Sequence, residues 1–277
     1  MESARARRVA RVPARDSGET ELTVLVEVVE RFQRLRARKP RVHCLTNSVA
    51  QPFTANLLLA AGALPSMSAS PDEVEAFIHR AGALLVNLGT LDAERRAALP
   101  LALAAAAKVS APFVLDPVFV DVSPPRLALA REIMAGMPAV IRLNAREFQA
   151  LAGLSPEPSH VRDFARAKRC VVALTGASDT VSDGTRLITV RNGHGFMAQV
   201  TGMGCAAGAL IAALLASGAA PLQAAVSGLT AIGVAGEIAG ETAGGPGSFA
   251  AGILDALDAL DGQTLRARAR LEIGDAG

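Results

Sequence analysis

The feature that most constrains the fold of this chain is a regular alternation of short apolar strands with helical segments. The predicted strands cover residues 41–45, 83–87, 112–115, 139–143 and 170–174, and segments with helical periodicity separate them. This alternation is typical of an α/β domain in which helices flank a mostly parallel sheet. With 277 residues and a hydrophobic content of 51%, the chain is long enough for one such domain.

A polar residue stands at or just past the end of each predicted strand. These residues are Asn47, Asn87, Asp116, Asn144 and Thr175. In an open parallel sheet, ligands bind at the edge formed by the carboxyl ends of the strands. A turn or a helix cap explains any one of these residues, but five along the same edge predict a binding site.

Residues 201–208, TGMGCAAG, predict an anion-binding turn. We expect a strand over residues 196–200 before it and a helix over residues 206–216 after it. Gly202 and Gly204 allow a tight turn whose N–H groups share one concavity, and the helix dipole adds positive potential there. This arrangement suits a phosphate. We expect the Cys205 thiol to have a lowered pKa beside that phosphate; the alternative is a glycine-rich connection with a buried cysteine.

The same glycines match a dinucleotide-binding fingerprint, so a NAD-binding oxidoreductase is an alternative function. That fingerprint has an acidic residue about 20 positions further on, whereas no charged residue lies between Arg191 and Glu237. The charge-free stretch is interrupted at residues 217–221, SGAAP. It therefore predicts two buried helices, over residues 206–216 and 222–239, rather than a membrane span.

Four polar residues have both a structural and a functional interpretation. Asp116 either begins a helix or faces Mg²⁺, which prefers few protein ligands together with phosphate oxygens. Asn144 and Glu147 are either a helix cap with its partner in the first turn or the holders of a metal's water shell. Arg142 is either a surface residue or a clamp on a nucleotide phosphate.

Composition excludes several classes of partner. A net charge of +2 and the absence of Trp and Tyr argue against nucleic acid and against a membrane surface. The three cysteines are scattered without zinc-ligand spacing, which predicts a reduced, cytoplasmic setting. We expect a disordered Arg-rich tail over residues 1–20, one domain over residues 21–262 and a C-terminal tail over residues 263–277.

Taken together, these segments closely resemble the hydroxyethylthiazole kinase family, whose fold is a ribokinase-like three-layer sandwich. The segments that carry the resemblance are VHCLTN (42–47), TANLL (54–58), GALPSM (62–67), NLGTL (87–91), LDPV (115–118), NARE (144–147), TG (175–176), NGH (192–194), VTGMGC (200–205) and GPGSF (245–249). They occur in the order of the family from about residue 22 to residue 262. A cysteine directly after the glycine turn is specific to this kinase within the wider fold.

The resemblance implies Mg²⁺-assisted transfer of phosphate from ATP to the primary alcohol of 4-methyl-5-(2-hydroxyethyl)thiazole, in thiamine biosynthesis or salvage. By position, it implies a catalytic role for Cys205, thiazole binding by Met67, Gly202 and Asn47, ATP binding by Arg142, Thr175, Gly204 and Asn144, and a metal side formed by Asp116 and Glu147. It also implies a homotrimer with thiazole sites at the subunit boundaries. A kinase of a hydroxymethylpyrimidine or pyridoxal type of alcohol remains an alternative.

The chain departs from the family pattern at three places. Phe119, Val120 and Asp121 stand where the family usually has Gly-Ala-Gly, and Leu143 replaces a glycine before Asn144. Residues 152–168 form a shorter segment than is usual. We expect the first two departures to reshape the phosphate loop and the approach of the nucleotide, and the third to affect the periphery.

Overall fold

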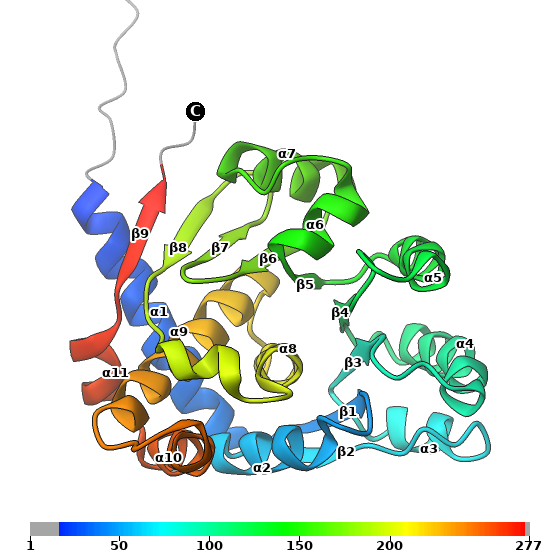
Figure 1. Ribbon diagram of the computed structural model, residues 1–277, viewed down its shortest axis with the longest axis horizontal. Coiled ribbons are helices and arrows are strands. Elements are labelled where there is room, and N and C mark those ends of the chain that lie inside the picture. The colour runs from blue at the N-terminus through cyan, green and yellow to red at the C-terminus, as the bar shows by residue number, and fades with distance from the viewer. Residues whose placement is uncertain (1–16, 275–277) are drawn as a thin grey trace, which may run out of the picture.

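Nine strands form one sheet in the order β2-β1-β3-β4-β5-β6-β7-β8-β9 in the computed structural model, which describes residues 17–274 (Figure 1). The parallel strands are β1 (Arg41–Leu45), β2 (Leu64–Ser66), β3 (Ala83–Asn87), β4 (Phe113–Asp116), β5 (Val140–Asn144) and β6 (Val171–Thr175). The antiparallel strands are β7 (Asp179–Ser182), β8 (Leu187–Val190) and β9 (Leu271–Gly274). The mostly parallel sheet predicted from the alternation is confirmed.

Helices cover both faces of this sheet (Figure 1). One face carries α1 (Ser17–Arg38), α2 (Gln51–Ala61), α8 (Met203–Ala216), α9 (Pro221–Gly240), α10 (Pro246–Ala259) and α11 (Gly262–Arg268). The other carries α3 (Val74–Ile78), α4 (Ala93–Lys108), α5 (Pro124–Met134), α6 (Ala145–Ala152) and α7 (Pro158–Lys168). Alternate strand residues enter the two cores, with Leu85 on the first face and Leu84 and Val86 on the second. The three-layer sandwich is therefore confirmed.

The charge-free stretch forms the two core helices α8 and α9, as its interruption at residues 217–221 predicts. By length and composition, α9 is apolar enough to cross a membrane, but 83% of its most apolar window is buried inside the fold. Alanines and glycines fill much of both helices, so that α8 packs closely against α9, α2 and the sheet. Close packing of this kind brings the start of α8 to the edge of the sheet.

Two segments differ from their sequence expectation. Residues 196–200 were expected to form a strand, but Gly195–Gln199 form the 3₁₀ helix η1, because the His194 ring accepts a hydrogen bond from the Phe196 N–H and caps the turn. Within the expected C-terminal tail, residues 263–274 complete α11 and form β9, which pairs with β8 through Ile188 and Ile273. Residues 1–16 and 275–277 of the two expected tails lie outside the described residues.

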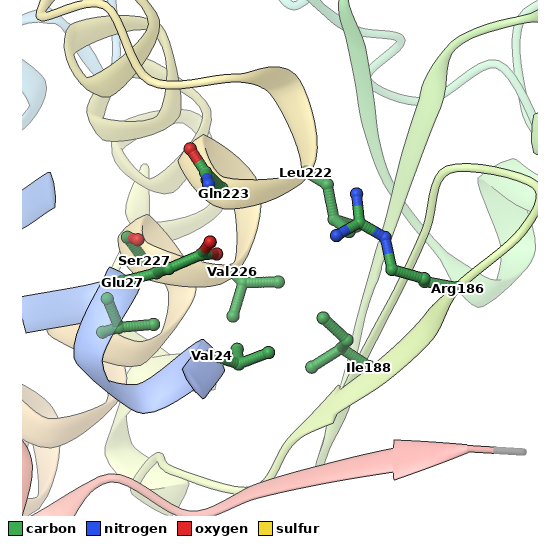
Figure 2. Close-up of a pocket in the computed structure, with 9 residues that line it drawn as sticks. Val24, Glu27, Arg186, Ile188, Leu222, Gln223, Val226 and Ser227 are labelled. Atoms are coloured by element: carbon green, nitrogen blue, oxygen red, sulfur yellow. The ribbon is translucent and has the colours of Figure 1, made fainter. Parts of the chain in front are cut away.

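A small cavity of about 10 Å³ lies where α1, α9 and β8 meet (Figure 2). Val24, Ile188 and Val226 point toward one another around it, and Ser227 lies beside Glu27 (Figure 2). Among the described residues, the Ser227 hydroxyl is buried without a hydrogen-bond partner. A volume of this size admits one water molecule at most, so this cavity is a packing feature and not a ligand site.

Candidate active site

A cavity of about 850 Å³ opens at the carboxyl edge of β5 and β6. Its walls are formed by these strand ends, by residues 192–200 and by the facing turns of α8 and α9. The lining includes Arg142, Asn144, Glu147, Thr175, Gly202, Gly204 and Cys205, all singled out from the sequence. The cavity lies within the range of about 300–1,000 Å³ that is typical of small-molecule sites.

The first turn of α8 forms the floor of this cavity and requires both of its glycines. Gly202 has a φ of 85°, a left-handed conformation that favours glycine. A Cβ on Gly204 would lie 2.5 Å from Nη1 of Arg142, so only glycine permits the guanidinium to approach the helix. The first turn of a helix also presents N–H groups without partners inside the helix, with the positive end of its dipole. Helix and guanidinium therefore create one positively polarised cradle.

Arg142 links this cradle to the neighbouring strand ends. Its Nη2 donates a hydrogen bond of 2.7 Å to the Thr175 hydroxyl, and its Nη1 lies 3.4 Å from Oδ1 of Asp116. Asp116 is fully buried and also accepts a 2.7 Å hydrogen bond from the Asn87 side-chain amide. Burial raises the pKa of Asp116, whereas Arg142 and Asn87 oppose that rise. Residues of four neighbouring strands, β3 to β6, thus form one polar network.

The Cys205 thiol lines the cavity and joins this network from α8. Its Sγ accepts a hydrogen bond of 3.2 Å from Nδ2 of Asn47. The expected lowering of its pKa is wrong. Burial and, secondly, the charge of Asp116 raise the pKa of Cys205 to about 11. The thiol is only 9% exposed, so desolvation and the nearby carboxylate outweigh the helix N-terminus. The side chain is therefore a neutral thiol in the resting protein.

Asn144 and Glu147 form a capping box at the start of α6, which confirms the helix-cap interpretation. Oδ1 of Asn144 accepts the Glu147 N–H at 3.0 Å, and Oε2 of Glu147 accepts the Asn144 N–H at 2.9 Å. Oε1 of Glu147 accepts the Phe119 N–H at 3.0 Å, which ties the loop after β4 to α6. Burial, and then the negative charge of Asp116, raises the pKa of Glu147. The cap thus leaves a carboxylate close to a second carboxylate.

The donor set at Asp116 and Glu147 fits a magnesium ion that keeps part of its water shell. A cation would relieve the repulsion that raises the pKa of Glu147. Each carboxylate has oxygen lone pairs beyond its hydrogen bonds. Within residues 17–274, no group of three or more His, Cys, Asp or Glu side chains is placed to hold a metal. Mg²⁺ commonly binds through one or two carboxylates, water and substrate phosphates, which is the set available here.

Three predicted residues, Asp116, Asn47 and Met67, lie outside the cavity lining. Asp116 is fully buried and reaches the lining through its contact with Arg142. Asn47 lies behind Cys205, with its Nδ2 also donating to Oδ1 of Asn87 at 3.2 Å. Met67 directly follows β2 at the edge of the sheet and is only partly buried. The structure therefore brings the other predicted residues together and leaves Met67 at the outer edge of the sheet.

Sequence reasoning missed Asp179 as part of this cavity, and it singled out Phe119 only as a departure expected to reshape the phosphate loop. Oδ1 of Asp179 accepts the Gly176 N–H at 3.0 Å and so holds the turn after β6. Its spacing of three residues from Gly176 is a turn signal that was available in the sequence. Phe119 has a φ of 60° and a side chain that is 59% exposed at the cavity. The family glycine that it replaces would adopt this backbone conformation without strain.

Comparisons with known proteins agree on one family. The model of the hydroxyethylthiazole kinase family matches residues 32–263. The chain is 46% identical over 249 residues to a hydroxyethylthiazole kinase of Granulibacter bethesdensis, covering 85% of this chain and 91% of that protein. It is 43% identical over 243 residues to a probable hydroxyethylthiazole kinase of Agrobacterium fabrum, covering 88% and 94%.

Solved structures extend this agreement to the fold. The hydroxyethylthiazole kinase protein of Pyrococcus horikoshii superposes with a TM-score of 0.85 at 37% identity, covering 90% of this chain and 99% of that one. The pyridoxal kinase of Staphylococcus aureus, in complex with AMP-PCP and pyridoxal, superposes with a TM-score of 0.61 at 15% identity, covering 85% and 98%. At that identity, the second likeness shows a shared fold only.

Proposed function

The chain belongs to the hydroxyethylthiazole kinase family, and we propose that it phosphorylates the hydroxyethyl group of 4-methyl-5-(2-hydroxyethyl)thiazole with ATP, in thiamine biosynthesis or salvage. The observation that carries this proposal is the convergence of the α8 N-terminus, Arg142 and Cys205 on one cavity of about 850 Å³. The first two supply positive charge for a phosphate, and the third marks the place of the acceptor alcohol.

The nucleotide phosphates lie against the positively polarised cradle in this proposal. The N–H groups of Gly202, Gly204 and Cys205 face the γ-phosphoryl oxygens, whereas that of Met203 donates to the Val200 carbonyl, and Arg142 neutralises the phosphoryl charge. Thr175 fixes the guanidinium through its 2.7 Å hydrogen bond, and Asn144 lines the same side. Because phosphoryl transfer passes through a loose transition state, positioning and charge neutralisation supply most of the rate.

Asp116 and Glu147 are the residues that would hold Mg²⁺ beside the nucleotide phosphates. When bound there, the ion supplies neutralisation of the phosphate charge. Hydrogen bonds within the protein hold the two carboxylates in place even when no ion is bound. Asn87 and Arg142 orient Asp116, and the backbone N–H groups of Asn144 and Phe119 orient Glu147.

Cys205 orients the alcohol. The thiol first loses its own proton to solvent, and the thiolate, a minor form in the free protein, then accepts the alcohol proton as the new O–P bond forms. A pKa of about 11 leaves almost no thiolate at neutral pH, so Cys205 is not a ready base in the free protein. A loose transition state makes little demand on proton removal before bond formation. The Asn47 amide, which donates to Sγ at 3.2 Å, holds the sulfur toward the cavity. Asn47, Met67 and Gly202 would bound the thiazole.

A coupled assay of ADP release tests this function. We expect turnover with the thiazole alcohol that requires Mg²⁺, and weaker turnover with hydroxymethylpyrimidine and pyridoxal at equal concentration. A preference for either of those alcohols would reassign the substrate and keep the kinase fold. No turnover of any of the three would contradict the function. The NAD-binding oxidoreductase alternative has no support in the comparisons.

Substitution of Cys205 separates its role from nucleotide binding. We expect Cys205→Ser to lower kcat by about 10²-fold, within the range of general acid-base contributions. The reason is that a serine hydroxyl loses its proton even less readily than the thiol does, so the deprotonated form that accepts the alcohol proton is rarer. Cys205→Asp should retain activity, because a carboxylate stays ionised where a thiol does not. The measurements are kcat and the ATP KM of each variant. Equal losses in kcat and in nucleotide affinity for the serine variant would argue against this role.

We further propose a cytoplasmic homotrimer with thiazole sites at the subunit boundaries. Met67 follows β2, the edge strand of the sheet, and Leu59 and Leu64 near it are exposed hydrophobic residues. An exposed edge with apolar side chains is a surface that a second subunit can cover. The three cysteines are free in the described part of the chain, which suits a reducing compartment.

A further inference from the structure

One wall of the cavity is held by a partly buried network that the proposed chemistry does not use. Asn192 and Gly193 line the cavity in the segment that leads from β8 to α8. The Gly193 N–H donates to Oε1 of Glu237 at 3.0 Å, and Nδ2 of Asn192 donates to both oxygens of Glu237 at 3.1 and 3.2 Å. Asn192 is 5% exposed. Glu237 on α9 therefore fixes the backbone and side chain of this wall.

The same wall lies in a groove that α9 forms with glycines. A Cβ on Gly233 would lie 2.7 Å from the Asn192 carbonyl oxygen, and a Cβ on Gly240 would lie 2.5 Å from the His194 ring. The His194 ring also packs against Phe249, with centroids 5.3 Å apart. The wall therefore cannot move closer to α9. Movement away from α9 would break the hydrogen bonds from Asn192 and Gly193 to Glu237.

The end of α11 and the connection from it to β9 complete the network. Oδ1 of Asn192 accepts the Arg270 N–H at 2.7 Å, and Nδ2 of Asn192 donates to the Arg268 carbonyl at 2.8 Å. The Arg270 guanidinium pairs with Glu237 and donates to the Arg191 carbonyl at 2.8 Å. Neither Glu237 nor Arg270 is among the cavity-lining residues. They reach the site only through the wall that they hold.

We propose that Glu237 and Arg270 are positioning residues for the nucleotide, holding the Asn192–Gly193 wall at the distance from Thr175 and Gly176 that ATP requires. The inference rests on the proposed function, because it takes the ligand of this cavity to be ATP. The wall continues through η1 into Gly202, so its displacement also moves the approach to the phosphate cradle. Asn47 and Met67 make no contact with this network among the interactions of the described residues. Of the three residues proposed to bound the thiazole, only Gly202 follows this wall along the chain, so we expect the network to act on ATP more strongly than on the thiazole.

Glu237→Gln and Arg270→Ala test this assignment. A Gln side chain has one acceptor oxygen and cannot serve Asn192, Gly193 and Arg270 together. We expect the dissociation constant of the non-hydrolysable analogue AMP-PCP, measured by calorimetry, and the ATP KM to rise about tenfold, or about 1.4 kcal/mol. The thiazole KM at saturating ATP should stay within twofold. Arg270→Lys, which keeps the charge facing Glu237, should recover part of the loss.

Glu272→Gln is the matched control, because it breaks the exposed pair with Arg191 on the same two strands and touches no wall residue. It should leave both constants unchanged. Unchanged AMP-PCP affinity in well-folded Glu237→Gln or Arg270→Ala overturns the inference, as do parallel losses for ATP and thiazole. If Glu237→Gln fails to fold, by circular dichroism, Arg270→Ala decides, because this side chain is more than half exposed. Failure of the wild-type protein to bind AMP-PCP would instead refute the proposed function.

Discussion

At the scale of single residues, burial sets the charge states in the cavity, and Asp179 gives a direct test. Burial raises its pKa from 3.8 to about 6, against the hydrogen bond from Gly176 and the charge of Arg142. The folded protein therefore binds this proton more tightly than the unfolded chain does. The contribution of Asp179 to the free energy of unfolding falls as pH rises from about 4 to about 6.

We expect Asp179→Asn to be more stable than the wild type at pH 7 by about 2–3 kcal/mol at most, from about 1.4 kcal/mol for each pKa unit. The Asn carbonyl still accepts the Gly176 N–H, so the turn after β6 is kept. This advantage should vanish below pH 4, where both side chains are neutral. Thermal unfolding of both proteins between pH 4 and pH 8 measures the difference. Parallel curves at all pH values would show that Asp179 ionises as an exposed carboxyl does.

At the scale of elements, the loop between β4 and α5 carries a backbone strain that its anchor to α6 maintains. Phe119 has a φ of 60° and donates its N–H to Glu147, while its ring is 59% exposed. A bulky residue in the left-handed region costs roughly 1–2 kcal/mol. We expect Phe119→Gly to keep or raise the free energy of unfolding, measured in urea. Val122→Gly, at a 73% exposed position of the same loop without positive φ, should lower it. If Phe119→Gly lowers the free energy of unfolding as much as Val122→Gly does, the backbone at Phe119 is not strained.

The elements predicted from sequence are those whose signals are local. The five strands from β1 to β6, apart from β2, lie within a residue of their predicted bounds, since buried apolar runs between helices define them. The capping box at Asn144 could also be predicted from the sequence, because its two partners, Asn144 and Glu147, are three residues apart. By contrast, η1 was expected as a strand, because its apolar residues suggested one and the cap by His194 was overlooked. β9 was expected as a tail, because it depends on a distant partner, β8.

The same division applies to the site. The glycine turn and the strand-end residues predicted where the cavity would be, and the structure places most of them there. The pKa of Cys205 was predicted in the wrong direction, because the local helix dipole was visible in the sequence whereas Asp116 and the burial of the thiol were not. Electrostatics that arise from residues brought together by the fold require the structure.

At the scale of the whole molecule, the edge strand β2 is where we propose that the subunits of the trimer meet. Leu64 on β2 is 39% exposed, three residues before Met67. If the trimer buries this edge and completes the thiazole site there, Leu64→Glu should dissociate it, because an unpaired charge in an apolar interface is strongly destabilising. We expect monomers by light scattering and a thiazole KM raised at least tenfold, with AMP-PCP affinity nearly unchanged. Met137→Glu, on an exposed hydrophobic residue in the α5–β5 connection, should leave the trimer intact. A Leu64→Glu trimer with normal thiazole affinity would place the interface elsewhere.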